Sequence, residues 1–142
     1  MKIHIITIGK PKLAYAQAGL EEYVRRLKHF HPLQVTHLSD RHNDVDHILG
    51  AVGRSFLVAL AIEGKQLSSH QLSAFLEKRL LDGRDICFVI GGPDGLPAEV
   101  LETADLRWSF SDLTLPHDLA MVVLAESLYR ACAISAGLPY HH

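Results

Sequence analysis

Residues 85–96 read DICFVIGGPDGL, an apolar run followed by three glycines. A short apolar run rich in β-branched and aromatic residues is typical of a strand that is covered on both faces. A second run of this kind, SFLVALAI, occupies residues 55–62. Strands buried on both faces occur in parallel sheets flanked by helices, so the two runs predict an α/β fold with a parallel sheet.

The rest of the chain alternates between strand and helix patterns. Helical spacing extends from Leu13 to about Phe30 and from Ser68 to Leu81, and 39–53 is predicted as a loop and a short helix. Thr114 is a candidate cap for a last helix that has Pro116 in its first turn. We therefore predict one domain over residues 1–142. Further strands are predicted at 2–8, 33–38 and 106–111, and a short helix at 98–104.

Composition excludes some classes of function. The net charge is −2, so any binding of nucleic acid needs a local basic patch. Residues 25–31 together with Lys10 and Lys12 are the candidate, although the solvated face of the first helix is the favoured explanation. No apolar run reaches the roughly 18 residues of a membrane span. Cys87 and Cys132 lie in apolar stretches outside any ligand pattern, which indicates buried thiols in a reducing cytoplasm.

Three predicted strands end in short segments that could form a ligand site. These segments are the one around Leu60, the glycine segment 90–96 and the hydroxyl-rich segment 110–115. The carboxyl ends of parallel strands share one edge of a sheet, and glycine lets the backbone approach a ligand. The glycine spacing is neither GxGxxG nor a phosphate loop, so a plain turn is the alternative. Such a pocket suits an adenine ring and ribose better than a triphosphate.

The last helix and one polar cluster leave further alternatives open. Residues 119–125, LAMVVLA, are apolar all round, which predicts cover by the sheet and by a second subunit. Glu126 and Arg130 stand at i and i+4, where they could support the helix or serve an interface. The histidines and aspartates of 37–47 lack metal-site spacing, so a solvated loop is favoured and no metal is predicted.

The segments IGGPDGL, WSFSDLTLPHDLAMVVLAESLYRA and PYHH together resemble the ribosomal RNA large subunit methyltransferase H family of the SPOUT superfamily. The resemblance begins at KIHIITIGK and covers nearly the whole chain. It implies an α/β fold with a C-terminal trefoil knot that binds S-adenosylmethionine. It also implies a cytoplasmic homodimer that methylates N3 of a pseudouridine in 23S rRNA of the assembled ribosome.

The resemblance assigns roles to individual residues. Tyr140 and His141 match the family's terminal Tyr-His, which is implied to act at an active site, that of the partner subunit being one option. The imidazole would help to remove the imide proton, and the phenol would stack on or orient the base. His117 is a second candidate base or a residue that stabilises its turn. The implied cofactor contacts are Leu60, Gly91, Phe110, Ser111, Asp112, Leu113, Thr114 and Leu115.

Two positions depart from the family pattern. Met121 stands where relatives usually carry arginine, and His142 stands where they usually carry arginine or lysine. A missing guanidinium would remove a contact suited to phosphate or to a uracil edge. The first alternative is therefore a non-catalytic paralogue that binds cofactor and RNA. A separate alternative is a flavodoxin-like nucleotide binder whose glycine loops hold another ligand.

Overall fold

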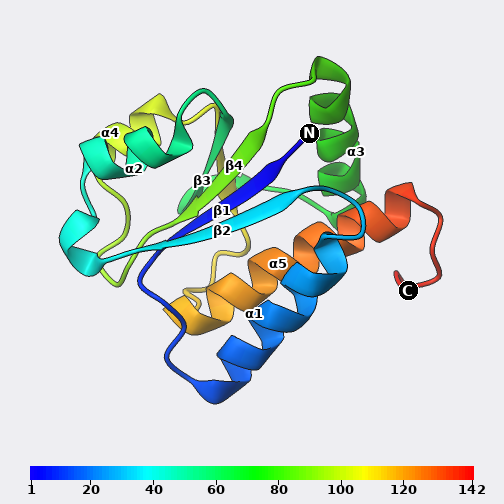
Figure 1. Cartoon of the computed structure of the whole chain (residues 1–142), viewed down its shortest axis with the longest axis horizontal. Helices are drawn as coiled ribbons and strands as arrows, with labels where there is room; N and C mark the ends of the chain where they lie inside the picture. Colours follow the sequence, from blue (N-terminus) through cyan, green and yellow to red (C-terminus); the bar gives the residue numbers. More distant parts are fainter.

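Five parallel strands form one sheet in the order β2-β1-β4-β3-β5 in the computed structural model, which describes residues 1–142 (Figure 1). This arrangement confirms the predicted parallel α/β fold. The order is compatible with a trefoil knot, which stays a prediction. The strands are β1 Ile3–Ile8, β2 Leu33–Leu38, β3 Phe56–Gln66, β4 Ile86–Ile90 and β5 Leu106–Ser109.

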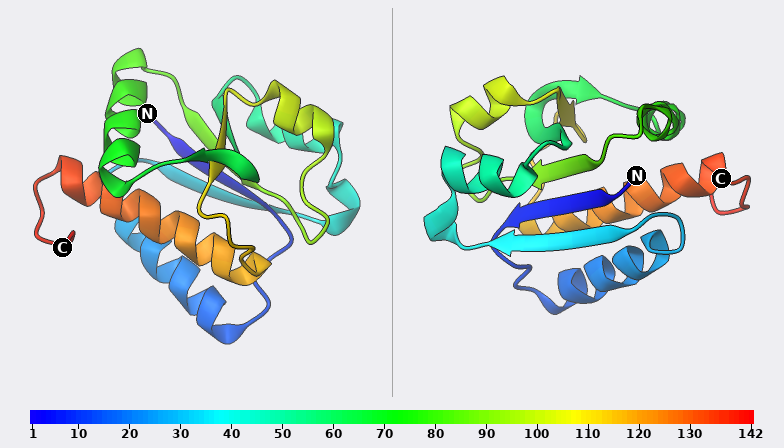
Figure 2. Two further views of the ribbon diagram at one scale, coloured as in Figure 1. Left: turned by 180° about the vertical axis from the view of Figure 1, so that it is seen from behind. Right: turned by 45° about the horizontal axis from the view of Figure 1, so that its top comes forward.

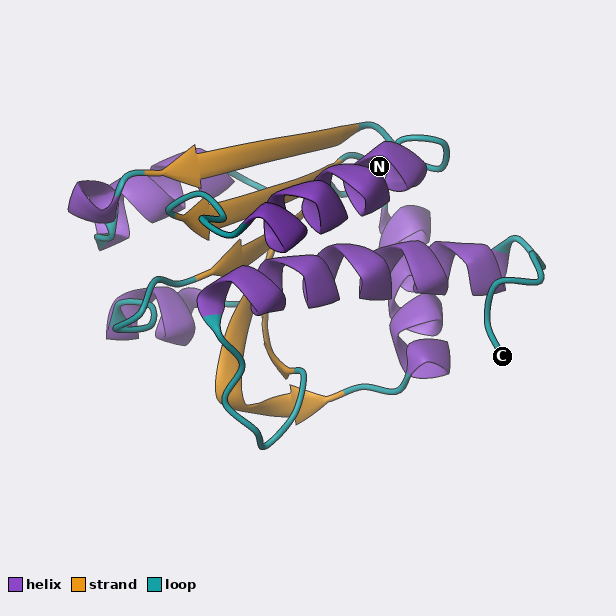
Figure 3. Ribbon diagram, turned by 90° about the horizontal axis from the view of Figure 1, so that it is seen from below, coloured by secondary structure: helices purple, strands orange, loops and turns teal.

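Helices cover both faces of this sheet. The helices α1 and α5 lie side by side on one face, and α2 and α4 lie on the other (Figures 2 and 3). The helix α3 packs against the second half of α5. None of the helices combines the length and the apolar character that a membrane crossing requires. Their bounds are α1 Ala14–Leu27, α2 Val45–Val52, α3 Ser69–Asp82, α4 Ala98–Thr103 and α5 His117–Ser135, with a 3-10 turn η1 at Asp40–His42.

Alternation along the strands divides the core into two layers. In β1, Ile3 and Ile5 face α1 and α5, whereas Ile6 and Ile8 face α2 and α4. All six residues of β1 are buried, as expected for a strand with helices on both sides. The larger layer also receives the buried face of α5, so this helix joins the sheet to α1 and α3.

The helix starts partly follow the predicted caps. The Ser68 hydroxyl accepts a hydrogen bond from the Gln71 amide at 3.0 Å, and the Gln71 side chain accepts one from the Ser68 amide at 2.8 Å. This capping box confirms the predicted start of α3. The prediction for α5 is wrong, because Pro116 is the cap residue and no side chain caps that helix. Thr114 instead belongs to the wall of a cavity described below.

Strand β3 is longer than the sequence predicts. Its Leu60 pairs with Trp108 of β5, and after a bulge Lys65 pairs with Trp108 again. Gly64 lies in this bulge, where an added Cβ would be only 2.7 Å from the carbonyl carbon of Arg107. Only glycine fits so close to a neighbouring backbone. The bulge leaves residues 61–64 out of the pairing with β5, and Ala61 and Ile62 line a cavity at the end of that strand.

A buried carboxylate ties the start of α5 to the start of α1. One oxygen of Asp118 accepts the amides of Lys12 and Leu13 at 2.8 and 2.7 Å. We expect Asp118→Ala to lower the free energy of unfolding by about 3 kcal/mol, because two amides lose a charged acceptor. Urea denaturation measures this change. Glu99→Ala, at an exposed site in α4, is the control, and an equal effect in both variants would contradict the assignment.

Both cysteines are buried thiols, as predicted. Burial raises the pKa of Cys87 to about 12 and that of Cys132 to about 11, so little thiolate forms at pH 8. We expect neither thiol to react with an aromatic disulfide reagent at pH 8 in the native protein, and both to react in denaturant. The absorbance of the released thiolate measures this, and a rapid native phase would contradict it.

Candidate functional site

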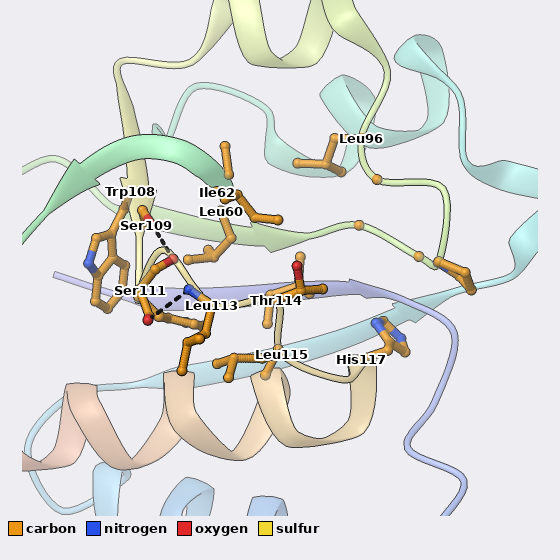
Figure 4. Close-up of a pocket in the computed structure, with 18 of the residues that line it drawn as sticks. Leu60, Ile62, Leu96, Trp108, Ser109, Ser111, Leu113, Thr114, Leu115 and His117 are labelled. Carbon is orange, nitrogen blue, oxygen red and sulfur yellow. Dashed lines mark hydrogen bonds between the residues drawn. The ribbon is translucent and has the colours of Figure 1, made fainter.

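A cavity of about 430 Å³ lies beyond the carboxyl ends of β3, β4 and β5 (Figure 4). Its size falls within the range of about 300 to 1,000 Å³ that is usual for small-molecule sites. Apolar side chains form most of its wall, and the polar groups around them come mainly from the backbone and from small hydroxyl side chains. The wall includes Leu60, Ile62, Leu96, Leu113 and Leu115.

The segment 110–115 forms one wall of the cavity and is held by its own hydroxyl groups. The Ser109 hydroxyl donates to the carbonyl of Ser111 at 2.9 Å, and the Ser111 hydroxyl accepts from the amide of Leu113 at 3.0 Å (Figure 4). The amides of Asp112, Thr114 and Leu115 have no hydrogen-bond partner within the protein. These local hydrogen bonds give the Ser109 and Ser111 hydroxyls a structural role. They fix a loop that leaves backbone amides free for a ligand.

The glycine segment after β4 forms the opposite wall. Gly92 and Gly95 form an antiparallel bridge, in which the Gly95 amide donates to the Gly92 carbonyl at 2.9 Å. The Asn43 side chain donates to the Gly95 carbonyl at 3.2 Å and so fastens the segment from outside. A Cβ on Gly91 would be 2.6 Å from the carbonyl carbon of Gly95. The turn is therefore closed on itself at Gly91 and leaves no room for a side chain.

The structure brings together almost all the residues that the resemblance assigns to the cofactor. Every one of them except Asp112 lines the cavity. Asp112 is exposed, and its carboxylate accepts from the side chain of Gln66 at 3.0 Å. The sequence gives no sign of Ile62 or Trp108, because their place in the wall depends on the bulge in β3. Gly64 is the one signal for that bulge, since glycine inside a strand often marks one.

His117 begins α5 at the edge of the cavity and lines it. Its Nε2 atom is buried and has no hydrogen-bond partner. The neighbouring His37 has a lowered pKa, first because it is buried and then because Lys10 is near. The lowered pKa favours the neutral form of His37, which adds no positive charge beside the start of α5, where the helix dipole is positive. His117 therefore lies close enough to meet a ligand, and its ring makes no hydrogen bond within the protein.

Tyr140 and His141 do not line the cavity. They contact Glu126 and Arg130 in the second half of α5, whereas His117 and Ala120 at its start line the cavity. At 1.5 Å per residue, Glu126 is about 14 Å along the helix from His117. Figure 1 shows the C-terminus beside the far end of α5. The tail of a chain is therefore remote from the cavity of the same chain.

The predicted basic patch is wrong as a single surface. Lys10 and Lys12 precede α1 near the cavity, whereas residues 25–31 follow at its far end, about 20 Å away along the helix. Met121 is buried in the main core, so this position does not reach a surface where phosphate could bind.

His42 and His47 stack with ring centroids 4.0 Å apart, and Asp44 accepts from the His47 ring at 2.7 Å. These contacts join neighbouring residues within the segment predicted as a solvated loop.

Known proteins match both the sequence and the fold. Two relatives named ribosomal RNA large subunit methyltransferase H, from Deinococcus radiodurans and Deinococcus deserti, are 49% and 50% identical over 144 residues, covering 99% of this chain and 99% of each relative. A probable methylase family protein from Haemophilus influenzae Rd KW20 has a TM-score of 0.61 at 12% identity, over 99% of this chain and 70% of that one. A probable methyltransferase from Bordetella pertussis Tohama I has a TM-score of 0.58 at 13% identity, over 92% and 95%.

At such low identity the two solved structures show a shared fold alone. The family model described as "Predicted SPOUT methyltransferase" matches residues 1–141. This match and the two relatives confirm the resemblance drawn from the sequence motifs. The chain belongs to the SPOUT methyltransferases, in the group of the ribosomal RNA large subunit methyltransferase H proteins.

Proposed function

We propose that this protein is an rRNA methyltransferase that uses S-adenosylmethionine to methylate N3 of a pseudouridine in 23S rRNA of the assembled ribosome. One observation carries the proposal. The segments around Leu60, Gly91 and 110–115, far apart in sequence, converge on one cavity in a chain half identical to proteins named as rRNA methyltransferases. A cytoplasmic location follows from this substrate.

The cavity fits the adenosyl part of S-adenosylmethionine. Leu60, Leu96 and Leu115 offer apolar surfaces for a flat ring, and the unpartnered amides of Thr114 and Leu115 offer donors. The closed turn at Gly91 allows a ligand to approach backbone atoms. The bound cofactor would supply a methyl group on a positively charged sulfur. The protein's tasks are to hold it, to exclude water and to align the target nitrogen with it.

The distance between the cavity and the tail supports a homodimer with shared sites. Tyr140 and His141 can act on a base in this reaction only at the cavity of a second copy, because their own cavity is too remote. A two-fold dimer would bring each tail to the partner's cavity. Apolar side chains near the cavity mouth and the start of α1 are more than half exposed and would be covered. They are Leu13, Tyr15, Ile62 and Leu113.

A methyl-transfer assay tests the function. Ribosomes from a strain that lacks the modification are incubated with the protein and with S-adenosylmethionine carrying a tritiated methyl group. We expect label in 23S rRNA at one nucleotide, identified by nuclease mapping. Label no higher than without protein would contradict an enzyme, and it would favour the non-catalytic paralogue if the cofactor still binds. Sedimentation as a monomer at micromolar concentration would contradict the dimer.

The basic end of α1 is proposed to contact rRNA phosphates. Arg25 and Lys28 are exposed near the tail, and Arg26 packs over the rings of Tyr23 and Tyr129. We expect the double variant Arg25→Gln, Lys28→Gln to reduce the slope of log affinity against log salt by roughly 1.5, from two lost phosphate contacts. Filter binding to ribosomes at several salt concentrations measures the slope. An unchanged slope would remove this surface from RNA binding.

A further inference from the structure

The C-terminal tail is folded against α1 and α5 by a set of polar and aromatic contacts. The Tyr140 hydroxyl lies 3.1 Å from the Glu126 carboxylate and 3.1 Å from the Tyr23 hydroxyl. Its ring lies 4.8 Å from the Arg130 guanidinium carbon and meets the ring of Tyr129 edge-on at 4.8 Å. Burial raises the pKa of Tyr140, and its hydrogen bonds to Tyr23 and Glu126 raise it further. The phenol therefore stays protonated and works as an anchor.

Arg130 links this anchor to His141. Its Nε donates to both carboxylate oxygens of Glu126, at 3.3 and 3.2 Å, and its Nη1 lies 3.1 Å from Nδ1 of His141. A guanidinium has donors and no acceptor, so Nδ1 must be the unprotonated nitrogen of the ring. In the neutral imidazole the proton then resides on Nε2. That nitrogen makes no hydrogen bond within the chain and is free to donate.

We infer that His141 acts as a hydrogen-bond donor through Nε2–H and not as the base, and that Arg130 and Glu126 are positioning residues that fix its tautomer. The inference rests on the proposed function, in which this tail meets the target base. An imide nitrogen lies between two carbonyl groups, and loss of its proton to solvent water spreads negative charge onto their oxygens. A donor fixed beside one of these oxygens stabilises that charge. The nitrogen on which a base would accept a proton is already occupied by Arg130.

The tautomer can be measured without any reaction. Long-range proton–nitrogen spectra of the ¹⁵N-labelled full-length protein at pH 8 distinguish protonated from unprotonated ring nitrogens, and His141→Gln identifies the signals of His141. We expect Nδ1 unprotonated and Nε2 protonated. Arg130→Met should move both signals toward the average of two exchanging tautomers, whereas Arg54→Met, at an exposed site beside α2, should not. A protonated Nδ1 in the wild type, or no response to Arg130→Met, would overturn the inference.

Two substitutions at His141 separate a donor from a base. Glutamine offers an oxygen to Arg130 and an N–H in place of Nε2–H, but it is no base, whereas methionine offers neither. In the ribosome assay we expect kcat of His141→Gln to stay within about tenfold of the wild type and that of His141→Met to fall about 100-fold. Equal loss in both variants would overturn the donor role.

Failure of the proposed function would be recognised separately. Wild-type protein that binds no cofactor or labels no ribosome contradicts the methyltransferase proposal, and the spectra then decide the Arg130 contact alone. A labelled ribosome with the wrong tautomer contradicts only the inference.

Arg130→Lys tests the geometry further, since an ammonium keeps the charge but cannot contact Glu126 and His141 through a planar fork. We expect it to behave like Arg130→Met in the spectra.

Discussion

Replacing Gly91 with alanine is expected to weaken binding of S-adenosylmethionine by about 100-fold, which corresponds to about 2.7 kcal/mol. The new Cβ would lie 2.6 Å from the carbonyl carbon of Gly95 and 2.8 Å from the amide nitrogen of Leu96. Both are backbone atoms, so the turn must move and the cavity wall must move with it. Equilibrium dialysis with radiolabelled S-adenosylmethionine measures the affinity.

Gly50→Ala is the matched control. Gly50 lies inside α2, and nothing lies within 4 Å of an added Cβ, so this variant should bind the cofactor like the wild type. Alanine should stabilise the helix by up to about 1 kcal/mol. Circular dichroism establishes that the Gly91 variant is folded. A folded Gly91→Ala protein with unchanged affinity would place the cofactor elsewhere.

Removal of residues 138–142 is expected to lower kcat about 100- to 1,000-fold while the affinity for S-adenosylmethionine is retained. The deletion removes Tyr140 and His141 together, and neither contacts the cavity of its own chain. Tyr140→Phe and His141→Ala should each lower the rate as well. The ribosome assay measures kcat, and titration with the cofactor measures the affinity. Unchanged turnover in the truncated protein would exclude the tail from the reaction.

Mixing the two impaired variants, at a cofactor concentration too low to occupy the Gly91→Ala cavity, tests whether the tail acts on the partner. A Gly91→Ala subunit keeps its tail, and a truncated subunit keeps its cavity. If each tail serves the other subunit, a mixed dimer contains one complete site, and an equal mixture recovers about a quarter of the wild-type rate. If the tail serves its own subunit, the mixture stays inactive. The subunits are mixed in denaturant and refolded so that mixed dimers form.

Local patterns were sufficient to predict the layers of this fold. The buried runs at 55–62 and 85–92 identify β3 and β4 because parallel strands under helices are apolar throughout. The second half of β3 could not be predicted in this way. Residues 63–66, EGKQ, are polar and read as a turn, and only pairing with β5 beyond the bulge makes them a strand. Such pairing depends on the tertiary structure and leaves only a weak trace in sequence.

The candidate cavity was predicted in outline for a physical reason. Parallel strands end at one edge, so the segments after β3, β4 and β5 had to lie near one another. The direction of individual side chains could not be predicted, and Asp112 turns outward to Gln66. The tail was hardest to predict, since most chain ends fray. Its anchors Tyr23 and Glu126 lie 117 and 14 positions away from Tyr140, and no local pattern connects them.

Calorimetric titration of the wild-type protein with S-adenosylmethionine tests the central claim most directly, namely that the cavity beyond β3, β4 and β5 holds this cofactor. We predict saturable heat at one molecule per chain, a higher melting temperature in its presence and competition by the demethylated product. Absence of heat together with an unchanged melting temperature would contradict the account.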